Sequence, residues 1–492
     1  AAVDIGSNSF RLLIGRIEPS SAGVQVQALD NLKEAVRLAA GLTPEGTLDA
    51  AAQQRGLEAL GRFAERLRSF SPDTVRAVAT NTLRVARNAR HFQSTAEAAL
   101  GFPIDIIAGL EEARLIYCGA AHAMAVDGER RLVIDIGGGS TECIIGCDYE
   151  PSLLESVTVG CVSITRKFFP DGLVDQSRLD KAVLRARAGF APIALAYRRA
   201  GWRYAVGTSG TAKSLTQIAT AAFGQAELTR ESLARMAQEL VRAGSADKVR
   251  LEGLRGDRRP VFPGGLAVMT AIFDELGVES LRYCAGALRQ GVLYDLLGRD
   301  AGADMRKVTV ARMTLRYGLD PEHGERVART AQVMHAQAAR GVTERSEADR
   351  ALLGWAAQLA EIGMSISHED FHKHSSYILS HADMPGFSQT EQDRMARLVL
   401  GQGGGLRKMR TSLVDSDDWL MLLCLRVSTI LHRRRDGEEV PMPALFAKRN
   451  RVRIELPRQW ALRHPLSDDS LRAEAAAWNE DGPFEDVAYE LF

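Results

Sequence analysis

Cysteine is scarce in this sequence, and its few cysteines form no recognisable pattern. The 492 residues contain 6 cysteines, which are scattered through apolar segments without a Cys-x-x-Cys spacing. This arrangement argues against a disulfide framework. We expect buried, reduced thiols.

Long apolar runs and an excess of one charge are also missing. No run reaches the roughly 18 apolar residues that a membrane helix needs. Lys plus Arg equals Asp plus Glu, at 62 each, so no global field attracts nucleic acid or a membrane surface. We therefore expect a cytoplasmic protein with no nucleic-acid partner and no integral membrane segment. Any polyanion would have to meet a local patch of positive charge.

The length and composition are those of a globular protein with several domains. Hydrophobic residues make up 46% of the chain and charged residues 25%. At roughly 150 residues per domain, the length predicts about three domains.

The stretch from Leu132 to Cys147 contains the most informative turn. Two apolar runs that are typical of strands enclose Gly137, Gly138 and Gly139, followed by Ser140 and Thr141. Glycines that adopt positive φ let successive backbone N–H groups converge on an anion, and the hydroxyl groups add donors. The turn is predicted to bind phosphate, with Asp135 beside it for Mg²⁺. A plain β-hairpin with a glycine turn is the alternative.

Two further turns support the phosphate interpretation. Residues 1–17 repeat the arrangement, with an apolar run, Asp4 in an Asp-Ile-Gly step, small polar residues at Ser7, Asn8 and Ser9, and a second apolar run. The two copies predict a duplicated domain whose turns face one cleft. A third turn, at 205–215, leads from an apolar run into a helical pattern. It places Gly207, Ser209, Gly210 and Thr211 where N–H groups can meet another phosphate.

Six motifs give the chain a resemblance to a known family. They are DIGSNSF at 4–10, the Thr-x-x-x-Arg step from Thr80 to Arg84, GLEEARLIYCG at 109–119, VIDIGGGSTE at 133–142, GTSGT at 207–211 and GALRQGVLYDLL at 286–297. In this order they resemble the exopolyphosphatase / guanosine pentaphosphate phosphohydrolase family, within the actin, sugar-kinase and DnaK-like ATPase superfamily. Farther along, HKHSSYILSHADMPGF at 372–387 resembles the helical C-terminal part of the long members of that family.

The resemblance assigns roles to individual residues. It makes Glu112, the second glutamate of the EEA motif, the general base that activates water, and Arg84 a phosphate clamp in the interdomain cleft. Glu111 and Glu112 are adjacent on a helix, about 100° apart, so only one of them can enter the site. Arg114 is expected to orient or pair with Glu112. Mg²⁺ is expected at Asp135, with Glu142 and Asp4 as further ligands, and K⁺ is a second candidate ion.

The C-terminal third is predicted to be helical and to lack a second active site. Its helices resemble the core of HD-type phosphohydrolases, but Ala360 and Glu361 occupy the position of the metal-binding His-Asp pair. The nearby histidines do not rebuild a known metal spacing; they are His368, His372, His374 and His381. Clustered basic residues could line a path for a linear polyanion; they are Arg407, Lys408, Arg410, Arg433, Arg434, Arg435, Lys448, Arg449, Arg451 and Arg453. For GALRQG, which contains Arg289, we expect packing and a helix cap rather than chemistry.

These observations predict an α/β fold with two actin-like, ribonuclease H-like domains around a cleft. The expected domains are 1–127 and 128–299, then a helical HD-like domain at 300–440 and a small α+β module at 441–492. The resemblance also implies a homodimer.

The predicted function is Mg²⁺-dependent, processive removal of terminal phosphate from inorganic polyphosphate. Guanosine pentaphosphate, hydrolysed at the same site, is the main alternative. A small-molecule kinase would need an adenosine pocket, which no motif identifies, and a non-catalytic nucleotide- or polyphosphate-binding regulator would bind without releasing phosphate.

Overall fold

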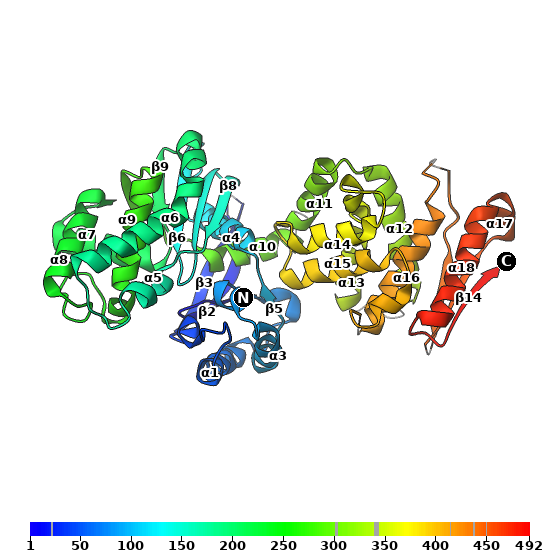
Figure 1. Cartoon of the computed structure of the whole chain (residues 1–492), viewed down its shortest axis with the longest axis horizontal. Coiled ribbons are helices and arrows are strands. Elements are labelled where there is room, and N and C mark those ends of the chain that lie inside the picture. Colours follow the sequence, from blue (N-terminus) through cyan, green and yellow to red (C-terminus); the bar gives the residue numbers. More distant parts are fainter. Residues whose placement is uncertain (21–22, 301–303, 339–343, 414, 436–437, 449) are drawn as a thin grey trace. The chain divides into compact units, whose positions relative to one another are not determined.

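A computed structural model describes residues 1–492 except 21–22, 301–303, 339–343, 414, 436–437 and 449. The chain forms two compact units, Ala1–Asp304 and Met305–Phe492 (Figure 1). Each unit is described by itself below.

Unit 1 begins with a five-stranded sheet. Its strands are β1 (Ala2–Ile5), β2 (Phe10–Ser20), β3 (Gly23–Glu34), β4 (Arg76–Ala79) and β5 (Ile104–Ile106). Their order is β3-β2-β1-β4-β5; β1 pairs antiparallel with β2 and parallel with β4. The helices of this half are η1 (Leu38–Gly41), α1 (Ala50–Leu67), η2 (Pro72–Thr74), α2 (Asn81–Val85), α3 (Ala89–Leu100) and α4 (Gly109–His122).

A second sheet repeats the order of the first. Its strands are β6 (Arg130–Ile136), β7 (Thr141–Cys147), β8 (Glu150–Val157), β9 (Tyr204–Gly207), β10 (Leu228–Thr229) and β11 (Ser280–Tyr283). The order is β10-β11-β9-β6-β7-β8, so β8-β7-β6-β9-β11 reproduces β3-β2-β1-β4-β5 with β10 added at the edge. The helices are α5 (Cys161–Phe168), α6 (Gln176–Ala200), α7 (Gly210–Phe223), α8 (Arg230–Ala243), η3 (Gly256–Val261), α9 (Phe262–Leu276) and α10 (Leu288–Asp300). The predicted α/β class and its duplication are confirmed.

Strand alternation decides which side chains lie between the two sheets. In β6, Leu132, Ile134 and Ile136 pack into the core of the second half, whereas Val133 packs into a separate core that joins the halves. Because successive side chains of a strand point to opposite faces, Asp135 lies on the same face as Val133. The same alternation in β1 puts Asp4 on the face of Ala2, which belongs to that joining core.

Helices α4 and α10 follow equivalent strands and touch backbone to backbone. A Cβ built on Gly291 would lie 1.7 Å from the carbonyl oxygen of Leu115, and one on Gly119 would lie 2.1 Å from that of Ala287. Any larger residue at these positions would push the helices apart. The glycines therefore fix the distance between the two helices that connect the halves of unit 1.

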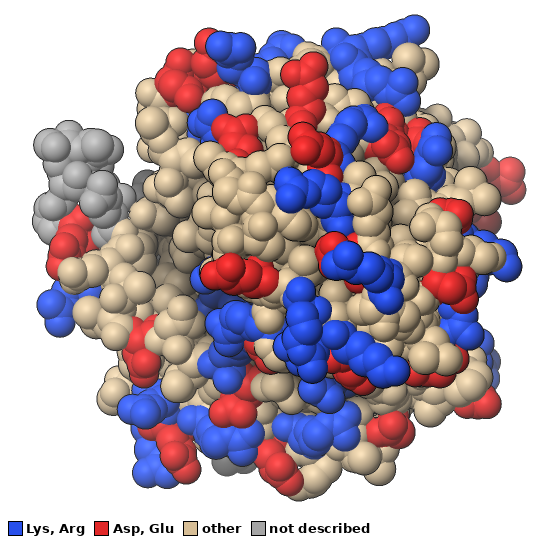
Figure 2. All heavy atoms as spheres, turned by 90° about the vertical axis from the view of Figure 1, so that its left-hand side faces the viewer, with Lys and Arg blue, Asp and Glu red and all other residues tan. Residues whose placement is uncertain are grey.

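One face of unit 1 carries charges of both signs. Figure 2 shows the face that lies on the left of Figure 1, where Lys and Arg gather in the lower half but are interspersed with Asp and Glu. This mixture agrees with the equal numbers of acidic and basic residues in the whole chain.

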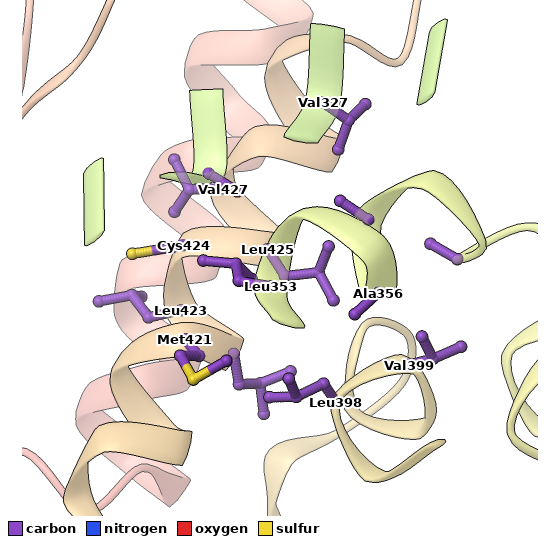
Figure 3. Packing of buried hydrophobic residues seen from close by; sticks show 14 of the residues in the cluster. Val327, Leu353, Ala356, Leu398, Val399, Met421, Leu423, Cys424, Leu425 and Val427 are labelled. Atoms are coloured by element: carbon purple, nitrogen blue, oxygen red, sulfur yellow. The ribbon is translucent and has the colours of Figure 1, made fainter. Parts of the chain in front are cut away.

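Unit 2 is mainly helical around one core. Its helices are α11 (Met305–Arg316), α12 (Pro321–Ala338), α13 (Glu344–Gln358), η4 (Ile362–Ser365), α14 (Phe371–His381), α15 (Gln389–Gly401), η5 (Leu406–Met409) and α16 (Ser416–Leu431). Figure 3 shows Val327 of α12, Leu353 and Ala356 of α13, and Leu398 of α15 packed against α16.

A small α+β segment closes the chain. Strands β12 (Ala444–Lys448) and β13 (Arg451–Leu456) are antiparallel, and β14 (Asp486–Leu491) pairs parallel with β13. Helices α17 (Arg458–Arg463) and α18 (Pro465–Asp481) lie between β13 and β14 in the chain. Trp478 and Val487 belong to the same hydrophobic core as the helices of unit 2. The four domain boundaries and the homodimer stay predictions. None of the described helices is long and apolar enough to span a membrane.

Candidate active site

The candidate site is a cleft between the two sheets of unit 1. Its volume is about 1770 Å³ when the solvent space at its opening is included. The predicted site residues that line it are Asp4, Ser7, Asn8, Ser9, Glu112, Asp135, Gly137, Gly138, Ser140, Ser209, Gly210 and Thr211. Gly139, Thr141, Glu142, Gly207 and Arg84 are not among the lining residues. The roles of all these residues stay predictions.

The two repeated turns meet across the cleft. A Cβ on Gly138 would lie 2.9 Å from the Cβ of Ser7, and one on Gly139 would lie 2.1 Å from Oδ1 of Asn81. The expectation of positive φ in this turn is wrong, because none of Gly137, Gly138 and Gly139 has a positive φ. Instead, Gly138 is needed for close approach to Ser7 of the first turn, and Gly139 for close approach to Asn81 of α2.

The third turn connects β9 to α7 beside the second. Thr208 donates a 2.6 Å hydrogen bond to Oδ2 of Asp135, and Ser209 caps α7 by accepting from the N–H of Ala212 at 3.1 Å. Gly210 and Thr211 form the first turn of α7, where N–H groups favour anions. Thr208 was not singled out from the sequence, although it lies inside the GTSGT motif.

Glu112 reaches the cleft from α4 and is paired with Arg84. Nη1 of Arg84 donates to Oε2 of Glu112 at 2.8 Å and to the carbonyl oxygen of Ile107 at 2.8 Å. Burial raises the pKa of Glu112 to about 7, although Arg84 opposes the shift and the negative charges of Asp4 and Asp135 add to it. A carboxylate with a pKa near neutrality can both accept and release a proton at physiological pH.

Three other predicted carboxylates share this environment. Burial raises the pKa of Asp135 to about 6, although the hydrogen bond from Thr208 acts to lower it. Burial is also the main cause of the raised pKa values of Glu142 and Asp4. Glu142 lies behind the cleft, where the hydroxyl of Ser156 donates to Oε1 at 2.8 Å. Glu112 and Glu142 are buried, and Asp4 and Asp135 are half-buried. Four such carboxylates in one region favour protons or a cation.

The donor chemistry fits Mg²⁺ held partly by water. Among the residues that the structure describes, no three Asp, Glu, His or Cys side chains converge closely enough to hold one metal ion. Mg²⁺ commonly uses one or two carboxylates, several waters and substrate phosphates. Asp135 and Asp4, both on the cleft surface, supply suitable oxygen ligands of that kind.

Arg114 pairs with Glu111 instead of Glu112. Its Nε and Nη2 donate to the two carboxylate oxygens of Glu111 at 2.7 and 2.8 Å, and Nη2 also donates to Asp295 of α10 at 2.5 Å. The expectation that Arg114 orients Glu112 directly is therefore wrong. Adjacent side chains on a helix point about 100° apart. Glu111 therefore joins a buried ion-pair network, whereas Glu112 faces the cleft.

Several basic residues that line the cleft were missed from the sequence. They are Arg11, Lys33, Lys213, Arg255, Arg258 and Arg289. Arg11 is the antiparallel register partner of Asp4, and Arg289 donates to Oδ1 of Asn31 at 2.7 Å. Arg289 lies in a quoted motif, Arg11 directly follows one and Lys213 lies in the 205–215 stretch, so sequence position was a usable signal for these three. Tertiary folding alone brings the other three to the cleft. Arg289 thus has a place in the cleft, where only packing was expected.

In unit 2 as well, no three Asp, Glu, His or Cys side chains of the described residues converge closely enough to hold one metal ion. Where HD-type enzymes carry the metal pair, Glu361 accepts a 2.5 Å hydrogen bond from Arg435, and Nε2 of His323 is 3.8 Å from Glu361. Five of the nine described residues of the predicted basic path are paired with acids: Arg410 with Asp481, Arg434 with Glu438, Arg435 with Glu361, Arg451 with Glu485 and Arg453 with Glu455. Arg449 lies outside the described residues.

The fold and the cleft define an α/β protein with two similar halves around a polar cleft, and comparison with known proteins gives its family. The Ppx/GppA phosphatase family matches residues 16–300, and the Ppx/GppA phosphatase domain III matches residues 305–475. The chain belongs to the Ppx/GppA phosphatase family and is a phosphoanhydride hydrolase.

Two curated relatives extend over nearly the whole chain. Proteins of Aeromonas hydrophila and Aeromonas salmonicida, both named guanosine-5'-triphosphate,3'-diphosphate pyrophosphatase, are 38% and 37% identical over 478 residues. Each match covers 96% of this chain and 95% of the relative.

A solved structure supports the fold. An exopolyphosphatase of Cytophaga hutchinsonii superposes with a TM-score of 0.53 at 24% identity and covers 60% of this chain and 96% of its own.

Proposed function

We propose that this protein removes the terminal 5'-phosphate of guanosine pentaphosphate. The observation that carries the proposal is the match to two relatives with that substrate in their names, each extending over 96% of this chain. Inorganic polyphosphate, which was the substrate expected from the sequence, is now the second candidate.

In the proposed mechanism the terminal phosphate lies between the turns at Ser7, Gly138 and Gly210. Backbone N–H groups and Ser or Thr hydroxyls hold its oxygens, and Arg84, which is paired with Glu112, is the proposed clamp. Glu112 takes a proton from a water molecule that attacks the terminal phosphorus. The bond to the bridging oxygen breaks, so orthophosphate and guanosine tetraphosphate leave. Phosphoryl transfer of this kind depends mainly on positioning and on electrostatic stabilisation.

Mg²⁺ is the proposed cofactor, with Asp135 and Asp4 as the residues that would hold it and Glu142 behind them. When bound, it would offset negative charge on the phosphate oxygens. The basic residues of the cleft add to that stabilisation. Lys33, Lys213 and Arg255 line it together with Arg289, and a nucleotide with phosphates on both the 5' and 3' positions presents two anionic groups to them.

The test is phosphate release from guanosine pentaphosphate and from long-chain polyphosphate, side by side, with and without Mg²⁺. We expect a higher kcat/KM for guanosine pentaphosphate and loss of release when Mg²⁺ is chelated. A higher kcat/KM for polyphosphate, with little phosphate release from the nucleotide, would identify polyphosphate as the preferred substrate.

A further inference from the structure

A loop of three glycines in unit 2 presents backbone donors without acceptors. Gly403, Gly404 and Gly405 connect the end of α15 to η5. None of their N–H groups has an acceptor within the part of the chain that the structure describes. Gly404 has a φ of 73°, a conformation that larger residues rarely adopt. Successive free N–H groups in such a turn form a concave site for an anion.

Lys408 supplies a positive charge to the same loop. Its Nζ donates to the carbonyl oxygen of Gly403 at 2.5 Å and lies 3.2 Å from where a Cβ on Gly404 would be. Lys408 has no carboxylate partner among the described residues. Burial lowers its pKa, and the positive charges of Arg426 and Lys373 lower it further. An anion beside the loop would relieve this repulsion.

His372 lies beside the same loop with unused hydrogen-bonding capacity. Its residue surface is only 8% exposed, and neither ring nitrogen bonds to a described residue. Nδ1 is 2.9 Å from the position of a Cβ on Gly403, and Nε2 is 3.8 Å from that on Gly404. A larger side chain at Gly403 would therefore displace the imidazole from the loop.

The neighbouring charges are compensated, so the excess positive charge belongs to Lys408. Arg426 donates to both carboxylate oxygens of Glu474, at 2.5 and 2.8 Å. Lys373 is 2.6 Å from Asp370. Gly404 and Gly405 are exposed and Lys408 is half-buried, so a dissolved anion can reach the loop.

We propose that the Gly403–Gly405 loop, Lys408 and His372 form a second phosphate-binding site, within unit 2 and distinct from the cleft of unit 1. Its ligand is a phosphate group, either free inorganic phosphate or one phosphate of a condensed chain. Three backbone donors, an ammonium group and an imidazole N–H match the acceptor oxygens of such a group. The site does not depend on which substrate the cleft prefers.

The test follows His372 directly in the full-length chain. In protein labelled with ¹⁵N-histidine, the His372 resonances are assigned by their disappearance in a His372→Asn variant and followed during titration with inorganic phosphate. No histidine lines the cleft of unit 1, so phosphate binding there does not contact the reporter. We expect the His372 resonances to shift and saturate in the wild type.

Lys408→Met tests the site, and Arg410→Met is its matched control. Arg410 is two residues away and pairs with Asp481 instead of facing the loop. We expect Lys408→Met to weaken phosphate binding at His372 by about tenfold or more, equivalent to about 1.4 kcal/mol, with Arg410→Met like the wild type. The remaining histidine resonances report whether each variant keeps its fold. The proposal is overturned if the His372 resonances do not respond to phosphate, or respond equally in Lys408→Met and Arg410→Met.

A second titration distinguishes the two sources of the phosphate group. Methylenediphosphonate is a diphosphate analogue that is not hydrolysed. Saturation at lower concentration than inorganic phosphate indicates a site for a condensed chain, and weaker binding indicates a site for free phosphate. Failure of both ligands to move the His372 resonances rejects the site for either source.

Discussion

At the scale of single residues, Glu112 combines access to the cleft with a pKa of about 7. Glu112→Gln keeps the shape of the side chain but cannot accept a proton. We expect kcat to fall by about 10²- to 10⁴-fold, with substrate binding retained. Phosphate release measures the first effect, and equilibrium binding of guanosine pentaphosphate measures the second. Phosphate release by Glu112→Gln at the wild-type rate would show that Glu112 is not the general base.

Arg84 should set the pH at which Glu112 becomes active. Only the deprotonated carboxylate can accept a proton, so kcat/KM should rise as the pH increases through about 7. Arg84 lowers the pKa of Glu112, so its removal favours the protonated form. In Arg84→Met we expect the inflection to move to higher pH, while Arg87→Met, an exposed arginine of the same segment, leaves it in place. An unchanged inflection in Arg84→Met would contradict this role.

At the scale of secondary-structure elements, a buried ion-pair network joins α4 to α10 and to the first sheet. Asp295 of α10 accepts hydrogen bonds from Arg114 of α4 and from Arg76 of β4, and its side chain is 6% exposed. The network holds the first turn of α4, the turn that directs Glu112 into the cleft. The hydrogen bonds to Asp295 also hold α10, the helix that carries Arg289, in position.

Asp295→Asn should therefore destabilise unit 1 strongly. Removing one partner of a buried pair leaves the other charges uncompensated, at a cost of about 3–5 kcal/mol. Glu239→Gln, which breaks an exposed pair with Arg242, is the control and should leave the thermal midpoint unchanged. Calorimetry of both variants measures the difference. Equal midpoints would mean that the network contributes little to stability.

At the scale of the whole molecule, all residues proposed for catalysis belong to unit 1. A solved structure matches 60% of this chain with 96% of its own length, so a comparable fold exists without the remainder. We expect the fragment 1–304 to fold and to release phosphate from guanosine pentaphosphate with a kcat within about tenfold of the intact chain, a difference of about 1.4 kcal/mol in barrier. Circular dichroism checks the fold, and phosphate release checks the site. A folded fragment without activity would show that unit 2 contributes to catalysis.

The sequence by itself determined the features that repeat at short range. The alternation of apolar and polar residues in β1 and β6 fixes the faces of Asp4 and Asp135, and the 100° between adjacent helical positions separates Glu111 from Glu112. The motifs also identified the family, because the two Asp-Ile-Gly turns and the EEA motif between them occur in the order typical of that family.

Only the tertiary structure decided the contacts between distant segments. Arg114 bonds Glu111 and Asp295 rather than Glu112, Thr208 bonds Asp135, and Lys33 and Lys213 reach the cleft from β3 and α7. The glycine turns need close approach instead of positive φ, a requirement that appears only when Gly138 meets Ser7. Such contacts depend on how whole elements pack, and the local spacing of residues along the chain does not encode them.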